Sequence, residues 1–320
     1  MKVRFWGTRG SLPVSLTAAQ TRAKVVAALE ASVGKGLDSR AKIEAFVDTE
    51  LPFATTGTFG GHSSCVQLES EGAGHVFMDL GSGARPLAGH YLRQVPPGEP
   101  QTYHVFMSHL HWDHIMGFPF FTPVYIPGNR VVIHTCHPNA EHAFRRQHTA
   151  PSFPVEFDTL AAAIEFDVLQ PGQTYDIAGY AVRAHAQLHA GGSYGWRFER
   201  DGQSMVYSTD SEHKLDDQAA LDGFAAFFRH ADLVVFDAMY SLADAISVRA
   251  DWGHSSNIMG VELCQAAAAR RLCLFHHEPS YDDARIATVL AQTRRYEEIS
   301  RGGQAALTVF TAYDGLEVDL

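Results

Sequence analysis

The sequence predicts an α/β fold of layered sheets and helices, with polar loops gathered along one edge. Apolar runs typical of strands recur in both halves of the 320-residue chain and alternate with helix-favouring segments. These runs end in histidines or aspartates. Because ligands of α/β proteins bind at the carboxyl ends of the strands, the polar residues are expected to face one shared site. The densest group is Ser-His-Leu-His-Trp-Asp-His at 108–114, directly after the apolar run 103–107.

Residues 108–114 predict a metal site with two ions. His109, His111, Asp113 and His114 are four potential ligands within six residues. Imidazole nitrogens and carboxylate oxygens suit zinc, manganese and iron. One tight turn cannot direct four such side chains at a single ion, so we expect two adjacent ions. The alternative, surface histidines beside a helix-capping aspartate, fits a lone His-Asp pair better than the complete H-x-H-x-D-H pattern.

Length, charge and cysteine content exclude several classes of protein. The length allows one large domain or two, and the continuous strand order predicts a single domain over residues 1–320. A formal charge of −11, from 25 Lys and Arg against 36 Asp and Glu, argues against a long nucleic-acid partner. No segment reaches the ~18 apolar residues of a membrane helix, so no membrane partner is expected. Four cysteines without C-x-x-C spacing fit a reduced, cytoplasmic setting.

The first fifty residues predict a strand, a glycine loop and an inserted helical hairpin. Residues 3–6 have the composition of a strand, and residues 7–11 form a tight loop that either faces a ligand or only ends the strand. Residues 16–31 and 39–50 favour helices and are separated by a glycine-containing turn. We therefore expect a helical insertion over residues 15–56, serving as a lid, a dimer contact or a surface decoration.

Further strands are expected on both sides of the histidine cluster. One of them ends at Asp79, whose carboxylate either supports the metal loop through hydrogen bonds or starts an ordinary turn. Others lead to Asp210 and Asp237. The expected strands are 64–69, 75–79, 130–134, 181–184, 194–199, 204–209, 232–236 and 271–275, with a helix over 257–270.

Several residues near these elements are expected to pack rather than react. Aromatic residues beside a buried turn either wall a pocket for an aromatic ring or belong to the core, and the core is favoured for Phe118, Phe120 and Phe121. Residues 138–160 show no clean periodicity and receive no assignment. The histidines expected on the surface or in packing are His62, His75, His213 and His230, with His213 the first to reconsider because it follows Asp210 closely.

The ordered set of polar signals resembles the metallo-β-lactamase fold superfamily, and the resemblance covers most of the chain. The set consists of Asp79, the H-x-H-x-D-H at 109–114, His189, Asp210 and His276. The resemblance implies a four-layer αβ/βα sandwich with a two-metal site on its edge. It implies one ion held by His109, His111 and His189, a second held by Asp113, His114 and His276, and Asp210 bridging them. The cofactors are then two divalent cations, with Zn²⁺ expected and Mn²⁺ or Fe²⁺ as alternatives.

Two ligand choices stay open from the residues alone. His276 and His277 are adjacent, and spacing favours His276. His185 competes with His189, but the glycine turn at 191–192 and the resemblance favour His189.

The last third of the chain resembles the phosphodiesterase branch of the superfamily. His254, within Gly-His-Ser-Ser, lies 22 residues before His276, as in a branch that includes tRNA 3′-processing nucleases and a cyclic-phosphate diesterase. The opening Phe-Trp-Gly-Thr-Arg-Gly-Ser-Leu-Pro at 5–13 resembles bacterial cyclic-nucleotide-phosphodiesterase-like hydrolases. By this resemblance His254 is the general acid. Asp237 is the candidate that orients it, with a strand-end cap as the alternative, and Asp113 completes the catalytic set.

Three features depart from the tRNA-processing enzymes. Residues 236–239 read Phe-Asp-Ala-Met where those enzymes have His-Glu-Ala-Thr, so the acid is kept and the histidine is lost. The sequence has no long Gly/Pro-rich basic arm, and the 15–56 insertion leaves access to the site undetermined. These differences lower the expectation of a tRNA nuclease.

The sequence therefore predicts a dinuclear metal-dependent hydrolase of a small phosphodiester, such as a cyclic nucleotide or another cyclic phosphate. The expected nucleophile is a metal-bound hydroxide, and His254 is the expected proton donor to the leaving alkoxide. Hydrolysis of a lactone, thioester or β-lactam is the alternative, and a redox diiron centre or metal-binding scaffold is a third hypothesis. A small-molecule substrate and a second copy of the chain are the expected partners.

Overall fold

Two seven-stranded sheets form the centre of the computed structural model, which describes residues 1–96, 98–241 and 252–320. The strands of the first sheet lie in the order β14-β1-β2-β3-β4-β5-β6, and β3 to β6 are parallel. Their bounds are β1 Lys2–Gly7, β2 Cys65–Glu69, β3 His75–Met78, β4 Thr102–Phe106, β5 Arg130–Thr135, β6 Ala163–Val168 and β14 Glu317–Asp319.

The second sheet has the order β13-β12-β11-β10-β9-β8-β7, and β10 to β13 are parallel. Strand β9 runs antiparallel to both β8 and β10, so β8 and β10 share a direction. The bounds are β7 Thr174–Ile177, β8 Tyr180–Gln187, β9 Ser193–Arg200, β10 Gln203–Ser208, β11 Leu233–Asp237, β12 Arg271–Phe275 and β13 Thr308–Thr311.

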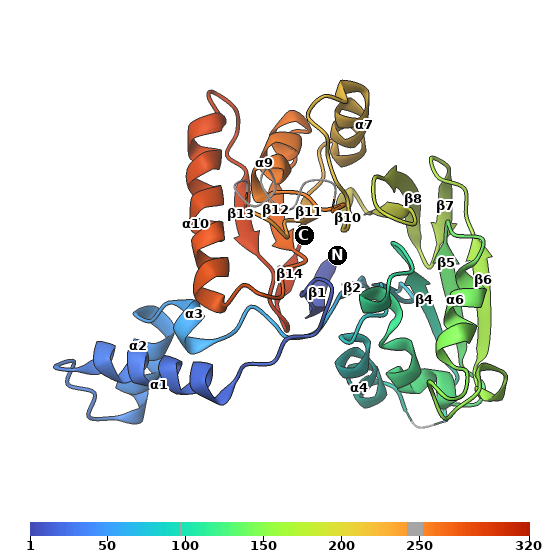
Figure 1. Cartoon of the computed structure of the whole chain (residues 1–320), viewed down its shortest axis with the longest axis horizontal. Helices are drawn as coiled ribbons and strands as arrows, with labels where there is room; N and C mark the ends of the chain where they lie inside the picture. Colours follow the sequence, from blue (N-terminus) through green and yellow to red (C-terminus); the bar gives the residue numbers. More distant parts are fainter. Residues whose placement is uncertain (97, 242–251) are drawn as a thin grey trace.

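Helices cover the outer face of each sheet (Figure 1). Helices α4 (Ala84–Gln94) and α6 (Ala140–Gln147) pack on the first sheet through a buried cluster that includes Leu87 and Phe144. Helices α7 (Gln218–Phe228), α9 (Asn257–Ala266) and α10 (Asp283–Ser300) pack on the second sheet. The order helix, sheet, sheet, helix confirms the predicted four-layer αβ/βα sandwich. Shorter helical turns are α5 Trp112–Ile115, η1 Phe118–Phe120, η2 Thr122–Tyr125 and η3 Phe157–Thr159.

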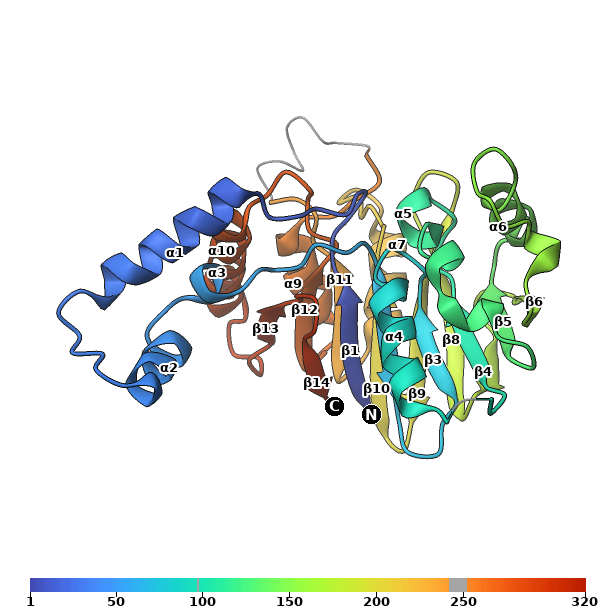
Figure 2. The same cartoon turned by 90° about the horizontal axis from the view of Figure 1, so that it is seen from below.

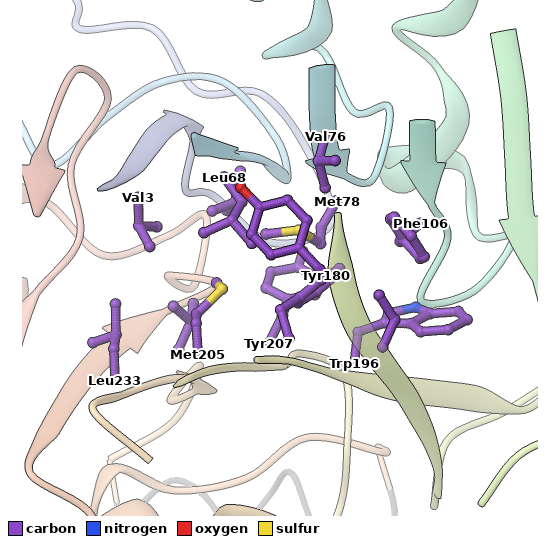
Figure 3. Close-up of a cluster of buried hydrophobic side chains, with 14 of the residues drawn as sticks. Val3, Leu68, Val76, Met78, Phe106, Tyr180, Trp196, Met205, Tyr207 and Leu233 are labelled. Carbon is purple, nitrogen blue, oxygen red and sulfur yellow. The ribbon is translucent and has the colours of Figure 1, made fainter. Parts of the chain in front are cut away.

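The inner faces of the two sheets meet in one apolar core (Figure 3). Because side chains alternate along a strand, β4 sends Tyr103 and Val105 toward the helices and Phe106 toward the other sheet. Phe106 contacts Trp196 of β9 edge-to-face, and the Trp196 indole N–H donates to the Met107 carbonyl over 3.0 Å. This packing fixes the end of β4, and therefore the start of residues 108–114, against the second sheet.

The predicted hairpin is present as α1 (Ala18–Ser32) and α2 (Arg40–Thr49), followed by α3 (Phe53–Thr56). Thr17 begins α1 with a capping box, and Ser39 caps α2. Lys24 attaches α1 to the body through an ion pair of 2.6 Å with Asp283 at the start of α10. The two helices project from the α10 side of the molecule, away from α5 (Figure 2). This position does not support the lid hypothesis.

No helix in the described ranges is both long and apolar enough to cross a membrane.

Candidate metal centre

The candidate site lies at the edge of the sandwich where strands of both sheets have their carboxyl ends. These strands are β3 and β4 of the first sheet and β8, β10, β11 and β12 of the second. Three residues that follow these strands have a left-handed backbone, with φ of 59° at Asp79, 51° at Asp210 and 60° at His276. Such conformations are uncommon outside glycine and cluster at functional sites, where the surrounding packing holds them. Here they turn each side chain sharply from its strand toward the shared edge.

His109, His111 and His189 form the first group of candidate ligands. Ligand atoms of these three side chains all lie within 4.8 Å of one another. The His189 Nε2 atom lies 3.1 Å from His111 Nδ1, and His189 Nδ1 donates to the Gly253 carbonyl over 2.7 Å. That bond leaves the Nε2 lone pair of His189 directed at the group.

Asp113, His114, Asp210 and His276 form the second group, and all four are buried. The Nε2 atoms of His114 and His276 lie 3.4 Å apart. Asp113 Oδ2 lies 3.2 Å from His114 Nε2 and 3.4 Å from His276 Nε2. Four buried polar side chains therefore converge, with their ligand atoms all within 4.8 Å of one another.

Asp210 joins the two groups through its two carboxylate oxygens. Its Oδ1 lies 3.7 Å from His109 Nε2 and 3.8 Å from His189 Nε2. Its Oδ2 lies 3.2 Å from His114 Nε2 and 3.3 Å from His276 Nε2. One oxygen thus faces each group, which is the arrangement of a bridging carboxylate.

Asp79 supports the histidine loop through hydrogen bonds, which is the first of the two alternatives that the sequence left open. It is fully buried and accepts hydrogen bonds of 2.7–2.8 Å from the Ser108 backbone and hydroxyl, the Tyr207 hydroxyl and His114 Nδ1. The bond from His114 Nδ1 leaves Nε2 as the free ligand atom. Sequence reasoning missed Tyr207, because its position next to Asp79 depends on the pairing of distant strands.

The glycine loop after β1 faces the site. The Ser11 backbone N–H donates to Asp113 Oδ2 over 2.8 Å. A Cβ atom at Gly10 would lie 2.6 Å from the His276 ring, so only glycine permits this approach. The structure thus resolves the two alternatives for residues 7–11 in favour of contact with the site.

The pKa shifts in the first group favour metal binding. Burial lowers the pKa of His109, His111 and His189, with neighbouring histidines adding to the effect. These imidazoles are therefore neutral near pH 7, the form that binds a metal.

The second group is more strongly charged. Burial raises the pKa of the Asp210 carboxyl, but the imidazoles of His276, His114 and His109 outweigh it and hold that pKa well below its usual value. Burial lowers the pKa of His114, but the carboxylates of Asp113, Asp210 and Asp79 outweigh it and raise that pKa. The carboxylates around His114 therefore favour a positive charge among them. A bound metal cation would supply such a charge.

The donor set fits a pair of divalent ions. Buried polar atoms are normally hydrogen-bonded, yet His109 Nε2 is buried without a hydrogen-bond partner. Two ligands of one tetrahedral zinc lie about 3.4 Å apart when each bond is about 2.1 Å. The separations in the second group match this value, and His and Asp are the ligand types that borderline divalent metals take.

His254 and Asp237 lie beside both ligand groups. His254 Nδ1 lies 2.9 Å from Asp237 Oδ2 and 3.9 Å from Asp210 Oδ1. Its ring stacks on that of His276, with centroids 5.2 Å apart, and ligand atoms of His254 also fall within the compact groups around His189 and His276. Burial lowers the pKa of His254, but the carboxylates of Asp237, Asp210 and Asp113 outweigh it and raise the pKa to about 9.

The remaining predicted histidines lie outside these groups. The His277 Nε2–H donates to the Ala312 carbonyl over 2.9 Å, and burial lowers the pKa of His277 to about 3. His185 stacks on Phe227, and His213 packs between Phe224 and Phe236. His62, His75 and His230 are also absent from the ligand groups of the described residues. The preference for His276, which came from spacing, and that for His189, which came from the glycine turn and the resemblance, agree with this geometry.

The phenylalanines after the histidine cluster divide between core and surface. Phe118 and Phe121 are fully buried, as the sequence predicted. Phe120 is 55% exposed, so its assignment to the core was wrong. It is the last residue of the short η1 turn, and its ring lies outside the helix-covered core.

Comparison with known proteins gives a matching family, a related sequence and solved structures of similar fold. The family described as β-lactamase superfamily domain matches residues 78–277. The ribonuclease Z of Halorubrum lacusprofundi is 25% identical over an alignment of 240 residues, and the match covers 56% of this chain and 70% of that protein. The metallo-β-lactamase fold protein YhfI of Bacillus subtilis has a TM-score of 0.64 at 16% identity, covering 99% of this chain and 98% of its own. A diphosphatase of the PhnP family has a TM-score of 0.59 at 16% identity, covering 100% and 97%.

Proposed function

The chain belongs to the β-lactamase superfamily domain family of hydrolases, and we propose that it is a dinuclear metal-dependent phosphodiesterase with a small substrate. The proposal is based on the position of His254. Its Nδ1 atom lies 2.9 Å from Asp237 Oδ2, and the ring lies beside the two ligand groups that Asp210 joins. The two ligand groups alone do not distinguish a phosphodiester from a carboxylic substrate. An imidazole held by a carboxylate at their edge adds a proton donor, which an alkoxide leaving group needs.

In this proposal the two groups hold one ion each. His109, His111 and His189 would hold the first ion, and Asp113, His114 and His276 would hold the second. Asp210 would be shared between the two ions, since one of its carboxylate oxygens faces each ligand group. Zinc is the proposed metal, with manganese and iron accepted by the same donor types.

When bound, two divalent ions lower the pKa of a water molecule and neutralise charge on phosphate oxygens. The chain itself supplies the positioned proton. Asp237 accepts from His254 Nδ1, which fixes the ring and leaves Nε2 to deliver a proton to the departing oxygen. The loop from Gly10 to Ser11 holds Asp113 and His276 in place through the contacts described above.

A small substrate is favoured over a long nucleic acid because the molecule lacks a basic arm. The hairpin that projects from the body has five basic and five acidic residues between positions 15 and 56, and the whole chain has a charge of −11. A phosphate-backbone footprint needs clustered Lys and Arg. We also infer a reducing, cytoplasmic setting, which the four buried free cysteines support.

The test compares two leaving groups on one methyl phosphodiester. Methyl phenyl phosphate releases phenolate, which is more basic than the p-nitrophenolate released by methyl p-nitrophenyl phosphate. His254→Ala should lower kcat about 10²–10⁴-fold for the phenyl ester and much less for the p-nitrophenyl ester. The reason is that p-nitrophenolate is the weaker base and leaves with less need of a proton. Metal content, measured by mass spectrometry, should stay at two ions per chain.

His142→Ala is the matched control, since His142 is an exposed histidine on α6. It should change neither rate. Equal loss of both rates in His254→Ala, or loss of both ions, would contradict the role of His254 as proton donor. Turnover of a lactone or β-lactam that is indifferent to His254 would instead support a carboxylic substrate.

Processing of tRNA 3′ ends is the second candidate, because a ribonuclease Z is among the relatives. Asp237 keeps the acid of the corresponding motif in those enzymes. Incubation with a precursor tRNA at low and high salt separates the two candidates. Specific removal of the 3′ trailer would favour the nuclease, whereas turnover of small diesters alone would favour the first proposal.

A further inference from the structure

A pocket adjoins the candidate metal centre between α5, η1, α6 and the loop that follows α6. Its volume is about 710 Å³, within the range of about 300–1,000 Å³ that is usual for small-ligand sites. His111, from the first ligand group, forms part of its wall. Helices α5 and α6 lie near each other at the same edge of the molecule (Figure 2). A group attached to a phosphorus atom at the metal centre can therefore extend directly into this pocket.

Three aromatic side chains dominate the pocket. Trp112 is 70% exposed and Phe120 is 55% exposed, although both lie beside a buried centre. Phe153 meets Phe120 edge-to-face, with ring centroids 5.8 Å apart. Exposed apolar side chains gathered around a hollow usually mark a binding site, because leaving them in water is unfavourable. Flat rings also select flat partners through stacking and edge-to-face contacts.

The aromatic walls are held by packing and hydrogen bonds around them. Gln147 Nε2 of α6 donates to the Ile115 carbonyl of α5 over 3.1 Å, which links the two sides of the pocket. The Phe153 ring also contacts the buried His148 ring, with centroids 5.0 Å apart. These contacts hold α5, α6 and the Phe153 ring in fixed positions around the pocket.

Arg146 adds a hydrogen-bond donor to this apolar surface. It lines the pocket and is exposed, and its guanidinium makes no hydrogen bond or ion pair with another residue in the described part of the chain. A free guanidinium presents several N–H groups in one plane and also stacks on aromatic faces. It suits a ring with acceptor atoms on its edge.

We propose that this pocket binds a planar aromatic group of the substrate, either an aryl ring or a nucleobase, between Trp112 and the Phe120–Phe153 pair. The proposal rests on the proposed function, because it assigns the pocket to the part of the phosphodiester that is not cleaved. Trp112, Phe120 and Phe153 determine specificity in this view, and Arg146 adds preference for rings that carry acceptor oxygens or nitrogens.

The test measures binding of three phosphate monoesters to the zinc-loaded protein by calorimetry. Phenyl phosphate, cyclohexyl phosphate and methyl phosphate carry the same headgroup and differ in the attached group. Phenyl phosphate should bind about tenfold more tightly than methyl phosphate, the size expected for one stacked ring, and more tightly than cyclohexyl phosphate. Equal binding of the phenyl and cyclohexyl esters would overturn the aromatic assignment, and equal binding of all three would overturn the pocket itself.

Substitutions at Phe120 identify the ring contact. Phe120→Leu should abolish most of the tenfold preference for phenyl over methyl phosphate, and Phe120→Tyr should restore it. Phe53→Leu is the matched control, because Phe53 is a 37% exposed phenylalanine that contacts Phe59 and Tyr313 elsewhere in the molecule. It should leave the preference intact. A preference unchanged in Phe120→Leu would contradict the assignment.

Binding of a nucleotide shows whether the pocket prefers a nucleobase or a simple aryl ring. If thymidine 5′-phosphate binds more tightly than phenyl phosphate, and Arg146→Gln but not Arg22→Gln removes the difference, the ring is a nucleobase. If the phenyl ester binds more tightly, the ring is a simple aryl group. Monoester binding needs no turnover, so it still tests the pocket if the protein hydrolyses no diester and the proposed function fails.

Discussion

Asp79, Asp210 and His276 each leave a strand through a left-handed residue, and each is buried. Residues in this region cost about 1–3 kcal/mol each, so the surrounding contacts must hold them. Asp79 shows how this is done, since four hydrogen bonds converge on its carboxylate from β10, His114 and Ser108. Asp79 thus uses its left-handed backbone to place a carboxylate that orients the candidate ligand His114.

Asp79→Asn should weaken metal binding about 10–100-fold, the usual effect of losing a group that orients a ligand. The asparagine amide has one acceptor oxygen and an NH₂ donor, so it cannot accept all the hydrogen bonds that reach Asp79. Competition with a coloured chelator measures the affinity. Asp176→Asn, at an exposed position on β7, is the matched control and should not alter it. Unchanged affinity in Asp79→Asn would contradict the supporting role.

A second residue-scale prediction concerns acid sensitivity. His104 of β4 lies 3.0 Å from His134 of β5, and burial, with the charges of His134, Arg130 and His75, lowers the pKa of His104 to about 4. An unfolded histidine titrates near pH 6.5. The unfolded chain therefore binds more protons than the folded one between these values, and stability falls as pH decreases from about 6.5 to about 4.

His104→Gln should make the unfolding free energy less dependent on pH in this window. Urea unfolding near pH 7 and near pH 5 provides the comparison. His142→Gln, at an exposed site on α6, should leave the dependence as in the natural chain. If His104→Gln kept the pH dependence of the natural chain, folding would not lower the pKa of His104, and the prediction would be contradicted.

At the scale of elements, the hairpin of α1 and α2 is separate from the core. None of the α1 residues is buried, and Val25, Leu29 and Val33 are 54%, 63% and 81% exposed. Helix propensity and two good N-caps support these helices, together with the Lys24–Asp283 ion pair. The homodimer stays a prediction, and the exposed residues of α1 provide a way to examine it.

Leu29→Ala should change the unfolding free energy by no more than about 0.5 kcal/mol, as is usual at exposed positions. Leu87→Ala on α4 is the comparison, since Leu87 is fully buried, and should cost about 2–5 kcal/mol. Thermal unfolding at two protein concentrations gives the measurement. A loss in Leu29→Ala that grows on dilution would place the hairpin in a subunit interface.

Elements with a clear apolar run were predictable from sequence, and others were not. The buried strands β4 and β11 follow continuous apolar runs, whereas β6 and β7 are half-exposed edge strands without such a pattern. Helix α4 contains Pro86 and Gly89 and has no side-chain cap, so its pattern is weak. Helix α10 was overlooked although Asp282 provides an N-cap signal.

The candidate site was more predictable than the elements around it. Six residues of H-x-H-x-D-H place their ligands by local spacing, and this group could be read directly. Tyr207, Ser11 and the pocket residue Arg146 could not, because each meets its neighbours only after distant segments pack. Residues 138–160 had no periodicity, yet they include the α6 side of the pocket.

At the scale of the whole molecule, the centre exists only when the two sheets pack together. Residues 109–114 follow β4 of the first sheet, whereas His189, Asp210 and His276 follow β8, β10 and β12 of the second. Each proposed ion therefore takes ligands from both halves of the sandwich. Asp210, from the second sheet, contacts the histidines of the first in both groups.

A crystal structure of the zinc-loaded protein with anomalous scattering tests the central claim most directly. The account predicts two anomalous peaks roughly 3.5–4 Å apart, as in other two-metal sites. One peak should lie among His109, His111 and His189, the other among Asp113, His114 and His276, with Asp210 between them. A single peak, or ions bound elsewhere in the chain, would contradict the dinuclear centre on which the proposed phosphodiesterase depends.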